Sequence, residues 1–351
     1  MARLLLAGYF GCGNLGDDAL LLAMVGAATS HSFQVLTASQ ESMMRKYGLP
    51  GVPRKDFGAI GQALDSCDAL VFPGGSIFQD VTSTASALYY SKLVGMAKKK
   101  GKKVVMLGQG IGPLNSFFGK RAATGAFAAA DAIAVRDPES ERALRTLGHK
   151  GRVEVTADLA WLLPPQGKAG EAFGVAASKT VGIAPRPWGK GHATAEVFAE
   201  TARALSQRGF MPVFIEMDHE SDGPLLSEIG KRLGGKAPEI KNLDSPRTVQ
   251  QRMARMDAVI AMRLHAGILA ALEGVPTYLV SYDPKVTALA PALGLSAPPR
   301  IDGLTSTRLV EGFASFMQDS EKVAASLPKR VEALHAASGR NIEVLERALA
   351  G

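Results

Sequence analysis

Residues 262–267, with the sequence MRLHAG, contain the chain's best candidates for chemistry. An apolar run at 258–261 precedes them and predicts a buried strand, and a helical pattern follows at 266–273. Arg263 and His265 are therefore expected where a strand ends and a helix begins. The helix dipole, a guanidinium and an imidazole all favour a bound anion at such a point.

Two further cations follow neighbouring predicted strands in the same half. Residues 277–280 predict a strand that leads into Ser281, and Lys285 comes four residues later. Arg186 follows the strand predicted at 181–184 and lies between two prolines, which restrict the backbone and so hold the guanidinium in place. A His close to an Arg, with a Lys at the next strand end, is more typical of a binding site than of a structural position.

The first predicted strand, 4–7, leads into residues 11–16 (GCGNLG), which match the glycine spacing of a dinucleotide-binding loop. We do not expect NAD there, because the strand at 33–37 ends without the acidic residue that binds the ribose. Asp17 and Asp18 would also repel a pyrophosphate at the helix N-terminus. They can instead cap the helix, which is the role expected of Asp18, or accept hydrogen bonds from sugar hydroxyls, which is the role expected of Asp17.

Glycines and polar residues also follow the next two strands. The strand at 69–72 is followed by a glycine pair that ends at Gly75, and such a pair lets backbone N–H groups face a ligand. An ordinary tight turn is the alternative. Gln79 and Asp80 come next, and Gln109 lies among glycines after the following strand. These residues are candidates for substrate binding.

Two other polar positions are less specific. Arg136 ends a predicted strand and can bind a carboxylate or a phosphate, although a structural ion pair fits equally well. His219 lies in an acidic loop, 217–222, whose spacing fits no standard metal site, so no metal is expected. The only cysteines, Cys12 and Cys67, form neither a disulfide framework nor a CxxC pair.

Short apolar runs alternate with helical patterns along the whole chain, which favours an α/β fold with parallel sheets and helices on both faces. Strands are expected at 4–7, 33–37, 69–72, 103–107, 132–135 and 153–156 in the first half, and at 181–184, 211–215, 258–261 and 277–280 in the second. Helices are expected at 19–28, 88–100, 195–208, 225–233, 248–255, 266–273 and 321–350.

A stretch rich in proline and glycine, 164–179, predicts a linker. We therefore expect an N-terminal Rossmann-like domain at 1–165 and a C-terminal Rossmann-like domain at 178–351 that includes the terminal helix. Two such domains in sequence match the GT-B-like plan, in which ligands bind at the carboxyl ends of the strands.

The 351-residue chain carries a net charge of +7, which suggests an anionic partner. Phosphorylated small molecules, an anionic membrane and nucleic acid all fit, but no dense basic stripe with interleaved aromatics favours nucleic acid. The lysine-rich segment 98–103 is expected to be a solvated helix end, with membrane docking as the alternative. No apolar run reaches the roughly 18 residues of a membrane helix. We expect a cytoplasmic protein, or one peripheral on the inner face of the cell membrane.

Taken together, these segments resemble the polysaccharide pyruvyl transferase family, and its CsaB type most closely. The matching segments are 13–17 with Asn14, 74–75, 79–80, 83–90, 108–113, 136–137, 157–158, 263–265 and 281–285. The likeness spans residues 5–293, and the order and spacing of the motifs are more specific than any one of them. Where the family has a Gln-Asp pair, this chain has Ser221 and Asp222, which leaves the role of that loop open.

The resemblance implies a GT-B-like fold and phosphoenolpyruvate as the donor substrate, without a metal or nucleotide cofactor. It implies an acceptor on the N-terminal side, a sugar such as N-acetylmannosamine in a cell-wall polysaccharide precursor, which becomes a 4,6-linked pyruvyl ketal. In the CsaB type that oligosaccharide precursor is lipid-linked, and polymers of this kind anchor S-layer proteins. The C-terminal domain would bind the donor.

On this basis Arg263, Lys285 and Arg186 would hold the donor's phosphate and carboxylate. His265 would protonate the methylene carbon or the departing phosphate, and Asp17 or Asp80 would orient the acceptor or act as base. The remaining expected substrate contacts are Asn14, Gly75, Gln79, Gln109, Arg136, His219 and Ser281. The competing predictions are a nucleotide-sugar-dependent glycosyltransferase on the same fold and a sugar- or phosphate-binding module without activity.

Overall fold

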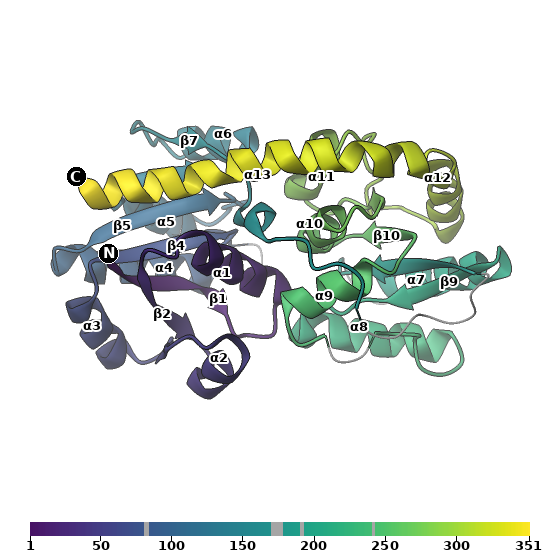
Figure 1. Cartoon of the computed structure of the whole chain (residues 1–351), viewed down its shortest axis with the longest axis horizontal. Helices are drawn as coiled ribbons and strands as arrows, with labels where there is room; N and C mark the ends of the chain where they lie inside the picture. Colours follow the sequence, from purple (N-terminus) through teal and green to yellow (C-terminus); the bar gives the residue numbers. More distant parts are fainter. Residues whose placement is uncertain (81–83, 170–177, 190–192, 241–242) are drawn as a thin grey trace. The chain divides into compact units, whose positions relative to one another are not determined.

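The protein is described by a computed structural model that covers residues 1–80, 84–169, 178–189, 193–240 and 243–351. It contains two compact units (Figure 1). The first consists of Met1–Leu163 together with Leu334–Gly351, and the second of Pro164–Ala333. Each unit has its own parallel sheet, so the α/β architecture expected from the alternating pattern is confirmed.

The first unit has a seven-stranded parallel sheet in the order β3-β2-β1-β4-β5-β6-β7. Its strands are β1 (Arg3–Phe10), β2 (Ser32–Thr37), β3 (Gly51–Pro53), β4 (Ala69–Gly75), β5 (Lys103–Gln109), β6 (Ala132–Val135) and β7 (Glu154–Val155). The strand order reverses between β1 and β4. In open α/β sheets the carboxyl ends of strands at such a switch point are where ligands bind.

Several helices of this unit begin directly after a residue whose side chain caps the helix. They are α1 (Leu15–Ala27), α2 (Gln40–Tyr47), α3 (Phe57–Ser66), α4 (Thr84–Lys99), α5 (Phe117–Ala129), α6 (Pro138–Thr146) and a 3₁₀ turn at Leu159–Leu162. Ser39, Asp56, Ser116 and Asp137 each accept a backbone N–H at a helix start. These caps fix the residues at which the four helices begin.

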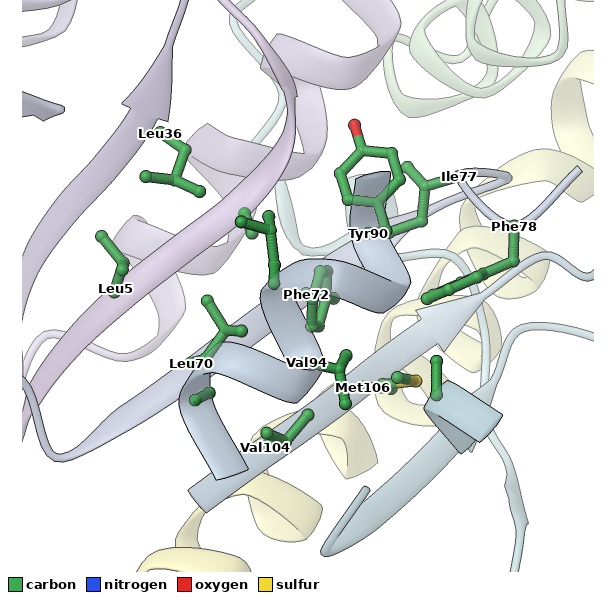
Figure 2. Packing of buried hydrophobic residues seen from close by; sticks show 14 of the residues in the cluster. Leu5, Leu36, Leu70, Phe72, Ile77, Phe78, Tyr90, Val94, Val104 and Met106 are labelled. Carbon is green, nitrogen blue, oxygen red and sulfur yellow. The ribbon is translucent and has the colours of Figure 1, made fainter. Parts of the chain in front are cut away.

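The hydrophobic core of the first unit lies between the sheet and its helices. Apolar residues from β1, β4 and β5 pack against α4 (Figure 2). The rings of Phe72, Phe78 and Tyr90 contact one another, with centroids 6.1–6.2 Å apart. Since Phe78 belongs to the loop that follows β4 and Tyr90 belongs to α4, this packing holds the first residues of that loop against the core.

The second unit has a four-stranded parallel sheet in the order β11-β10-β8-β9. Its strands are β8 (Lys179–Ala184), β9 (Phe210–Phe214), β10 (Ala258–Ala261) and β11 (Thr277–Leu279). Its helices are α7 (Ala193–Gln207), α8 (His219–Arg232), α9 (Pro246–Met253), α10 (Leu264–Leu272), α11 (Pro284–Ala292) and α12 (Ser306–Gln318). Since β10 lies between β8 and β11, the residues that follow these three strands meet at one edge.

The last helix is α13 (Ser320–Ala350), and its two ends belong to different units, which the sequence did not predict. Residues from Leu334 onward group with the first unit, whereas we expected the whole tail in a domain at 178–351. The buried side chain of Asn341 accepts a hydrogen bond from the Thr156 hydroxyl at 2.9 Å and donates one to the Ala157 carbonyl at 3.0 Å. These bonds satisfy polar groups next to β7 and attach the tail there.

All ten expected strands are present. The short strand β3 and the helices α2, α3, α5, α11 and α12 were not among the expected elements. Helix α1 begins at Leu15, four residues before the expected start, because Asn14 provides the cap. Of the predicted linker at 164–179, residues 170–177 lie outside the described residues, as does residue 83 of the matching segment 83–90.

Candidate functional site

The loop between β1 and α1 turns on two glycines, Gly11 and Gly13, whose φ angles are 65° and 83°. Asn14 follows, and its Oδ1 accepts hydrogen bonds from the backbone N–H groups of Gly16 at 3.0 Å and Asp17 at 3.3 Å. The residue expected to bind substrate is therefore the N-cap of α1. This cap sets the direction in which the next side chains leave the helix.

The neighbouring acid Asp18 does not cap the helix, contrary to expectation. Its buried carboxylate accepts hydrogen bonds from the backbone N–H of Gly11 at 2.9 Å and from the hydroxyl of Tyr47 at 2.8 Å. Burial raises the pKa of this carboxyl, and the two hydrogen bonds oppose that rise. Asp18 is thus a structural brace for the glycine turn.

Asp17 lies against the backbone of Gly75. A Cβ built on Gly75 would lie 3.3 Å from the Asp17 Oδ1, and Gly75 has a φ of 89°. A side chain at this position would both strain the backbone and press on the carboxylate. The half-buried Asp17 carboxylate is therefore placed at the switch point between β1 and β4.

Gln109 is the last residue of β5, and it is buried at the carboxyl edge of the sheet. The side chain is fully buried, and its Nε2 donates to the carbonyls of Phe72 at 2.9 Å, Gly74 at 3.3 Å and Leu107 at 3.1 Å. These carbonyls belong to the ends of β4 and β5. Gln109 therefore holds the glycine pair in place.

Asp80 is committed to the start of α5. Its carboxylate accepts hydrogen bonds from the N–H groups of Asn115 and Ser116, both at 2.7 Å, and from the Ser116 hydroxyl at 2.6 Å. Burial alone would raise the pKa of this carboxyl, but the hydrogen bonds outweigh it and the pKa is lowered. Gln79 lies beside Gly112, where a Cβ would come within 2.7 Å of the Gln79 Cβ.

Arg136 forms the structural ion pair that the sequence left as an alternative to ligand binding. Its guanidinium lies 3.3 Å from Asp137, 3.3 Å from Asp158 and 3.1 Å from the hydroxyl of Ser76. The side chain is only 6% exposed. Gly110 has to be a glycine here, because a Cβ would lie 2.4 Å from this guanidinium.

Arg54, which directly follows the short strand β3, was not among the residues expected at a site. Its guanidinium carbon lies 4.8 Å from the ring centre of Tyr9 and 5.5 Å from that of Tyr89, and Nη1 lies 2.9 Å from the sulfur of Cys12. The hydroxyl of Tyr89 donates to the Arg54 carbonyl at 2.6 Å. In the described part of the chain no carboxylate pairs with this guanidinium, so it is a half-buried cation held by aromatic rings.

In the second unit, Arg263 is buried and paired. Its guanidinium contacts the Asp222 carboxylate and the Ser221 hydroxyl, and it lies 3.5 Å from Asp218. Asp222 is fully buried and also accepts the backbone N–H of Met217 at 3.1 Å. Burial raises the pKa of Asp222, and the Arg263 charge opposes that rise. We expected Arg263 to grip an anion directly, but the structure places it in a buried network.

The loop whose role the sequence left open therefore holds Arg263. Asp222 reaches the strand end from the first turn of α8, while His219 at the start of α8 points outward. The His219 side chain is 84% exposed, and its Nδ1 lies 2.6 Å from Glu216. His219 is on the surface of this unit, with an acid as its neighbour.

His265 occupies the first turn of α10, two residues after Arg263, and is half-buried. Arg263 is the N-cap residue of this helix but makes no side-chain capping bond to it. The helix start with the imidazole therefore follows β10 directly, as expected.

Two cations share one aromatic ring at the same edge of the second sheet. The guanidinium carbon of Arg186 lies 4.9 Å from the ring centre of Tyr282, and the Lys285 nitrogen lies 5.3 Å from it. Trp188 packs on the same ring at 5.2 Å, and its indole N–H donates to Asp302 at 2.8 Å. The structure thus brings together Arg186 and Lys285, which are about 100 residues apart in sequence.

The contact between Lys285 and the carboxylate of Asp283 is long. Asp283 lies 3.9 Å from the Lys285 nitrogen and also accepts the Lys285 backbone N–H at 3.0 Å. Ser281, expected to contact substrate, is fully buried, and its hydroxyl lies 2.8 Å from that of Thr287. The Arg186, Tyr282 and Lys285 side chains, which we call the basic cluster, form an under-neutralised positive surface that suits an anion.

Among the residues that the structure describes, no group of three or more His, Cys, Asp or Glu is arranged to hold a metal ion. No helix in the described ranges is long and apolar enough to cross a bilayer.

Solved structures with this architecture share the fold at low sequence identity. The chain resembles HepE from Anabaena in complex with UDP-glucose, with a TM-score of 0.64, 14% identity and coverage of 99% of this chain and 98% of that one. A putative UDP-N-acetylglucosamine 2-epimerase from Listeria monocytogenes matches with a TM-score of 0.68, 12% identity, and 98% and 96% coverage. The S. aureus MnaA–UDP structure matches with a TM-score of 0.66, 12% identity, and 100% and 97% coverage. The fold is GT-B, as expected.

The sequence matches no curated protein. The family model described as "Polysaccharide pyruvyl transferase" matches residues 14–284, which is most of the chain. The match contains Asp17 at the edge of the first sheet and Arg186 and Tyr282 of the basic cluster, and it ends one residue before Lys285. The match therefore reaches from the cap of α1 to the start of α11. The chain is an enzyme that belongs to the polysaccharide pyruvyl transferase family.

Proposed function

We propose that the enzyme transfers the pyruvyl group of phosphoenolpyruvate to a sugar of a cell-wall polysaccharide precursor. The observation that carries this proposal is the basic cluster, in which Arg186 and Lys285 share the Tyr282 ring at the strand edge where α10 begins. Phosphoenolpyruvate carries a phosphate and a carboxylate on three carbons. Two fixed cations on one ring suit two anionic groups that lie close together.

We assign Arg263 a positioning role, whereas its motif suggested direct contact with the donor's anionic groups. Because its guanidinium contacts Asp222 and Ser221, it fixes the end of β10 and the start of α10. It therefore positions His265, which lies two residues later in the first turn of α10. We assign Arg186 and Lys285 to the donor's charges and Arg263 to the support of His265.

The reaction then requires an addition followed by a displacement, both at the second carbon of the donor. The methylene carbon gains a proton, for which His265 is the acid, and the adjacent carbon becomes oxocarbenium-like. One sugar hydroxyl adds to that carbon and loses its proton. A second hydroxyl of the same sugar then displaces phosphate, which departs with the remaining proton. The products are a cyclic pyruvyl ketal and inorganic phosphate, and the scheme uses no metal or nucleotide cofactor.

On the acceptor side we assign Asp17, which lies against Gly75 at the switch point of the first sheet. A carboxylate at that place can accept hydrogen bonds from sugar hydroxyls and take up a proton. Arg54, between the Tyr9 and Tyr89 rings, adds a cation to the same unit. We propose N-acetylmannosamine in a lipid-linked precursor as the acceptor, a 4,6-ketal as the product and the cytoplasm as the location.

Thermal denaturation distinguishes this function from nucleotide-sugar-dependent glycosyl transfer. Phosphoenolpyruvate is expected to raise the melting temperature, and UDP-glucose and UDP-N-acetylglucosamine are expected to leave it unchanged. The matched variants are Lys285→Ala, which should lose the shift, and Arg300→Ala, an exposed cation of the same unit, which should keep it. A shift with the UDP-sugars alone would favour the glycosyltransferase and overturn the proposal.

A further inference from the structure

The start of α5 carries the most exposed pair of aromatic side chains in the described part of the chain. Phe117 is 71% exposed and Phe118 is 66% exposed. Their rings contact each other edge to face, with centroids 5.6 Å apart and an interplanar angle of 77°. Most large apolar side chains of the protein are buried, so two adjacent exposed phenyl rings form a local apolar surface.

This pair is held rigidly. Ser116 caps α5 through the backbone N–H of Gly119 at 3.0 Å, and the Asp80 carboxylate accepts the Ser116 hydroxyl and backbone N–H. The opposite side of α5 packs into the core through Ala123 and Phe127. The helix cannot rotate to bury the phenyl rings without withdrawing that face, so the rings stay on the outside.

The charge around the rings is positive. Lys120 and Arg121 follow in the next turn, both are exposed, and α5 contains no acidic residue. Neither cation has an ion pair in the described ranges. The Lys120 charge does act on Asp80, but that carboxylate is already bonded to Asn115 and Ser116. We call residues 117, 118, 120 and 121 the aromatic–basic patch.

We propose that the aromatic–basic patch docks the protein on the surface of an anionic phospholipid bilayer. The two rings would enter the boundary between headgroups and acyl chains, and the two cations would meet the anionic headgroups. Such contact is peripheral and needs no spanning helix, and the net charge of +7 has the matching sign. The proposal does not depend on the reaction, because vesicle binding is measured without either substrate.

A protein partner fits the patch less well. Two phenyl side chains bury about 150–250 Å² each, which together is well below the roughly 800 Å² per partner of a stable protein interface. A second copy of this chain, joined through a two-fold axis, would also bring Lys120 and Arg121 against themselves. An anionic bilayer, in contrast, can bind a small apolar area that is accompanied by unpaired positive charge.

The lysine-rich segment 98–103 is a weaker candidate than the sequence suggested. The Lys98 nitrogen binds Asp131 at 2.8 Å, and the Lys100 nitrogen binds Asp65 at 2.5 Å. Local carboxylates therefore neutralise two of these lysines, in contrast to Lys120 and Arg121.

Co-sedimentation of the full chain with vesicles tests the proposal. The wild-type protein is expected to bind vesicles that contain phosphatidylglycerol and to bind pure phosphatidylcholine vesicles weakly. Phe117→Ser combined with Phe118→Ser is expected to reduce partitioning at least about ten-fold. Lys120→Gln combined with Arg121→Gln is expected to reduce it only for the anionic vesicles, and increasingly so at low salt.

Two controls make the result decisive. Met44→Ser removes another exposed apolar side chain and should leave partitioning unchanged, as should Lys98→Gln combined with Lys100→Gln. All variants change exposed residues, so their melting temperatures should equal that of the wild type. Equal partitioning of the wild type and the double phenylalanine variant would overturn the proposal. A wild-type dimer that the same variant abolishes in sedimentation velocity would also overturn it, in favour of a second copy.

Discussion

The guanidinium of Arg263 and the carboxylate of Asp222 form a buried ion pair that joins the end of β10 to the first turn of α8. The two side chains are 7% and 0% exposed. Two backbone N–H groups, of Met217 and Asp218, satisfy the same carboxylate at 3.1 and 3.0 Å. The motif that marks the family is thus supported by an acid 41 residues earlier in the chain.

Two replacements of Asp222 should distinguish its effect on protein stability from its effect on kcat. Asp222→Ala leaves a buried guanidinium without its main partner, so we expect the free energy of unfolding to fall by about 3–5 kcal/mol. Asp222→Asn keeps a hydrogen-bond acceptor and should cost less stability but still lower kcat, because the start of α10 shifts. Urea denaturation and steady-state kinetics measure the two effects. The control is Asp218→Asn, whose carboxylate lies farther away at 3.5 Å; an equal loss there would contradict the special role of Asp222.

The basic cluster should govern donor affinity. Lys285→Ala or Arg186→Ala removes a charged contact, and we expect KM for phosphoenolpyruvate to rise about 10- to 100-fold. Tyr282→Leu should have a smaller effect, since it removes the ring that holds both cations and leaves the charges present. Kinetics at varied donor concentration measure these changes, with Arg300→Ala as the control. Unchanged KM in both single-cation variants would remove the basis for the donor assignment.

Arg54 should act on the acceptor alone. Arg54→Ala is expected to raise KM for the acceptor about ten-fold and to leave KM for phosphoenolpyruvate unchanged, because Arg54 and Asp17 both belong to the first unit. Arg54→Lys should recover part of the affinity, since it keeps the charge between Tyr9 and Tyr89. The exposed neighbour Lys55 provides the control, as Lys55→Ala. A rise in KM for the donor would show that the assignment is wrong.

Asp18 should give the protein a stability that declines as the pH rises. Burial raises the pKa of its carboxyl in the folded state above the ordinary value of 3.8, so the folded protein holds this proton more tightly than the unfolded chain. That contribution is complete below the unfolded pKa and is lost as the pH rises through the folded pKa. Asp18→Asn should therefore flatten the dependence of the unfolding free energy on pH across this window.

Urea denaturation from about pH 4 to about pH 7 measures this slope. Glu41→Gln, at a side chain that is 88% exposed, is the control and should keep the wild-type dependence. An Asp18→Asn variant with the wild-type slope would refute the linkage.

The sequence predicted the elements that follow strong local patterns. Buried runs such as β10 and β4 have few polar residues, so their positions and the residues just after them were foreseeable. The placement of His265 at the start of α10 followed from an apolar run directly before a helical pattern. The three-residue strand β3 was too short for such a pattern, and Arg54 was missed with it.

Partners that are distant in sequence could not be foreseen. Whether a polar side chain meets a ligand or a buried group depends on contacts that no local spacing encodes. Gln109 binds three carbonyls of neighbouring strand ends, and Arg136 pairs with Asp158, 22 residues later. The terminal helix is the clearest case, because Asn341 joins the first unit through Thr156, 185 residues earlier.

The most direct test of the central claim is mass spectrometry of an acceptor aminosugar, lipid-linked or synthetic, after incubation with the enzyme and phosphoenolpyruvate. One pyruvyl ketal on the acceptor and an equimolar release of phosphate are expected, with both products strongly reduced in His265→Gln. An unmodified acceptor in this reaction, together with a glycosyl adduct when a UDP-sugar replaces phosphoenolpyruvate, would contradict it.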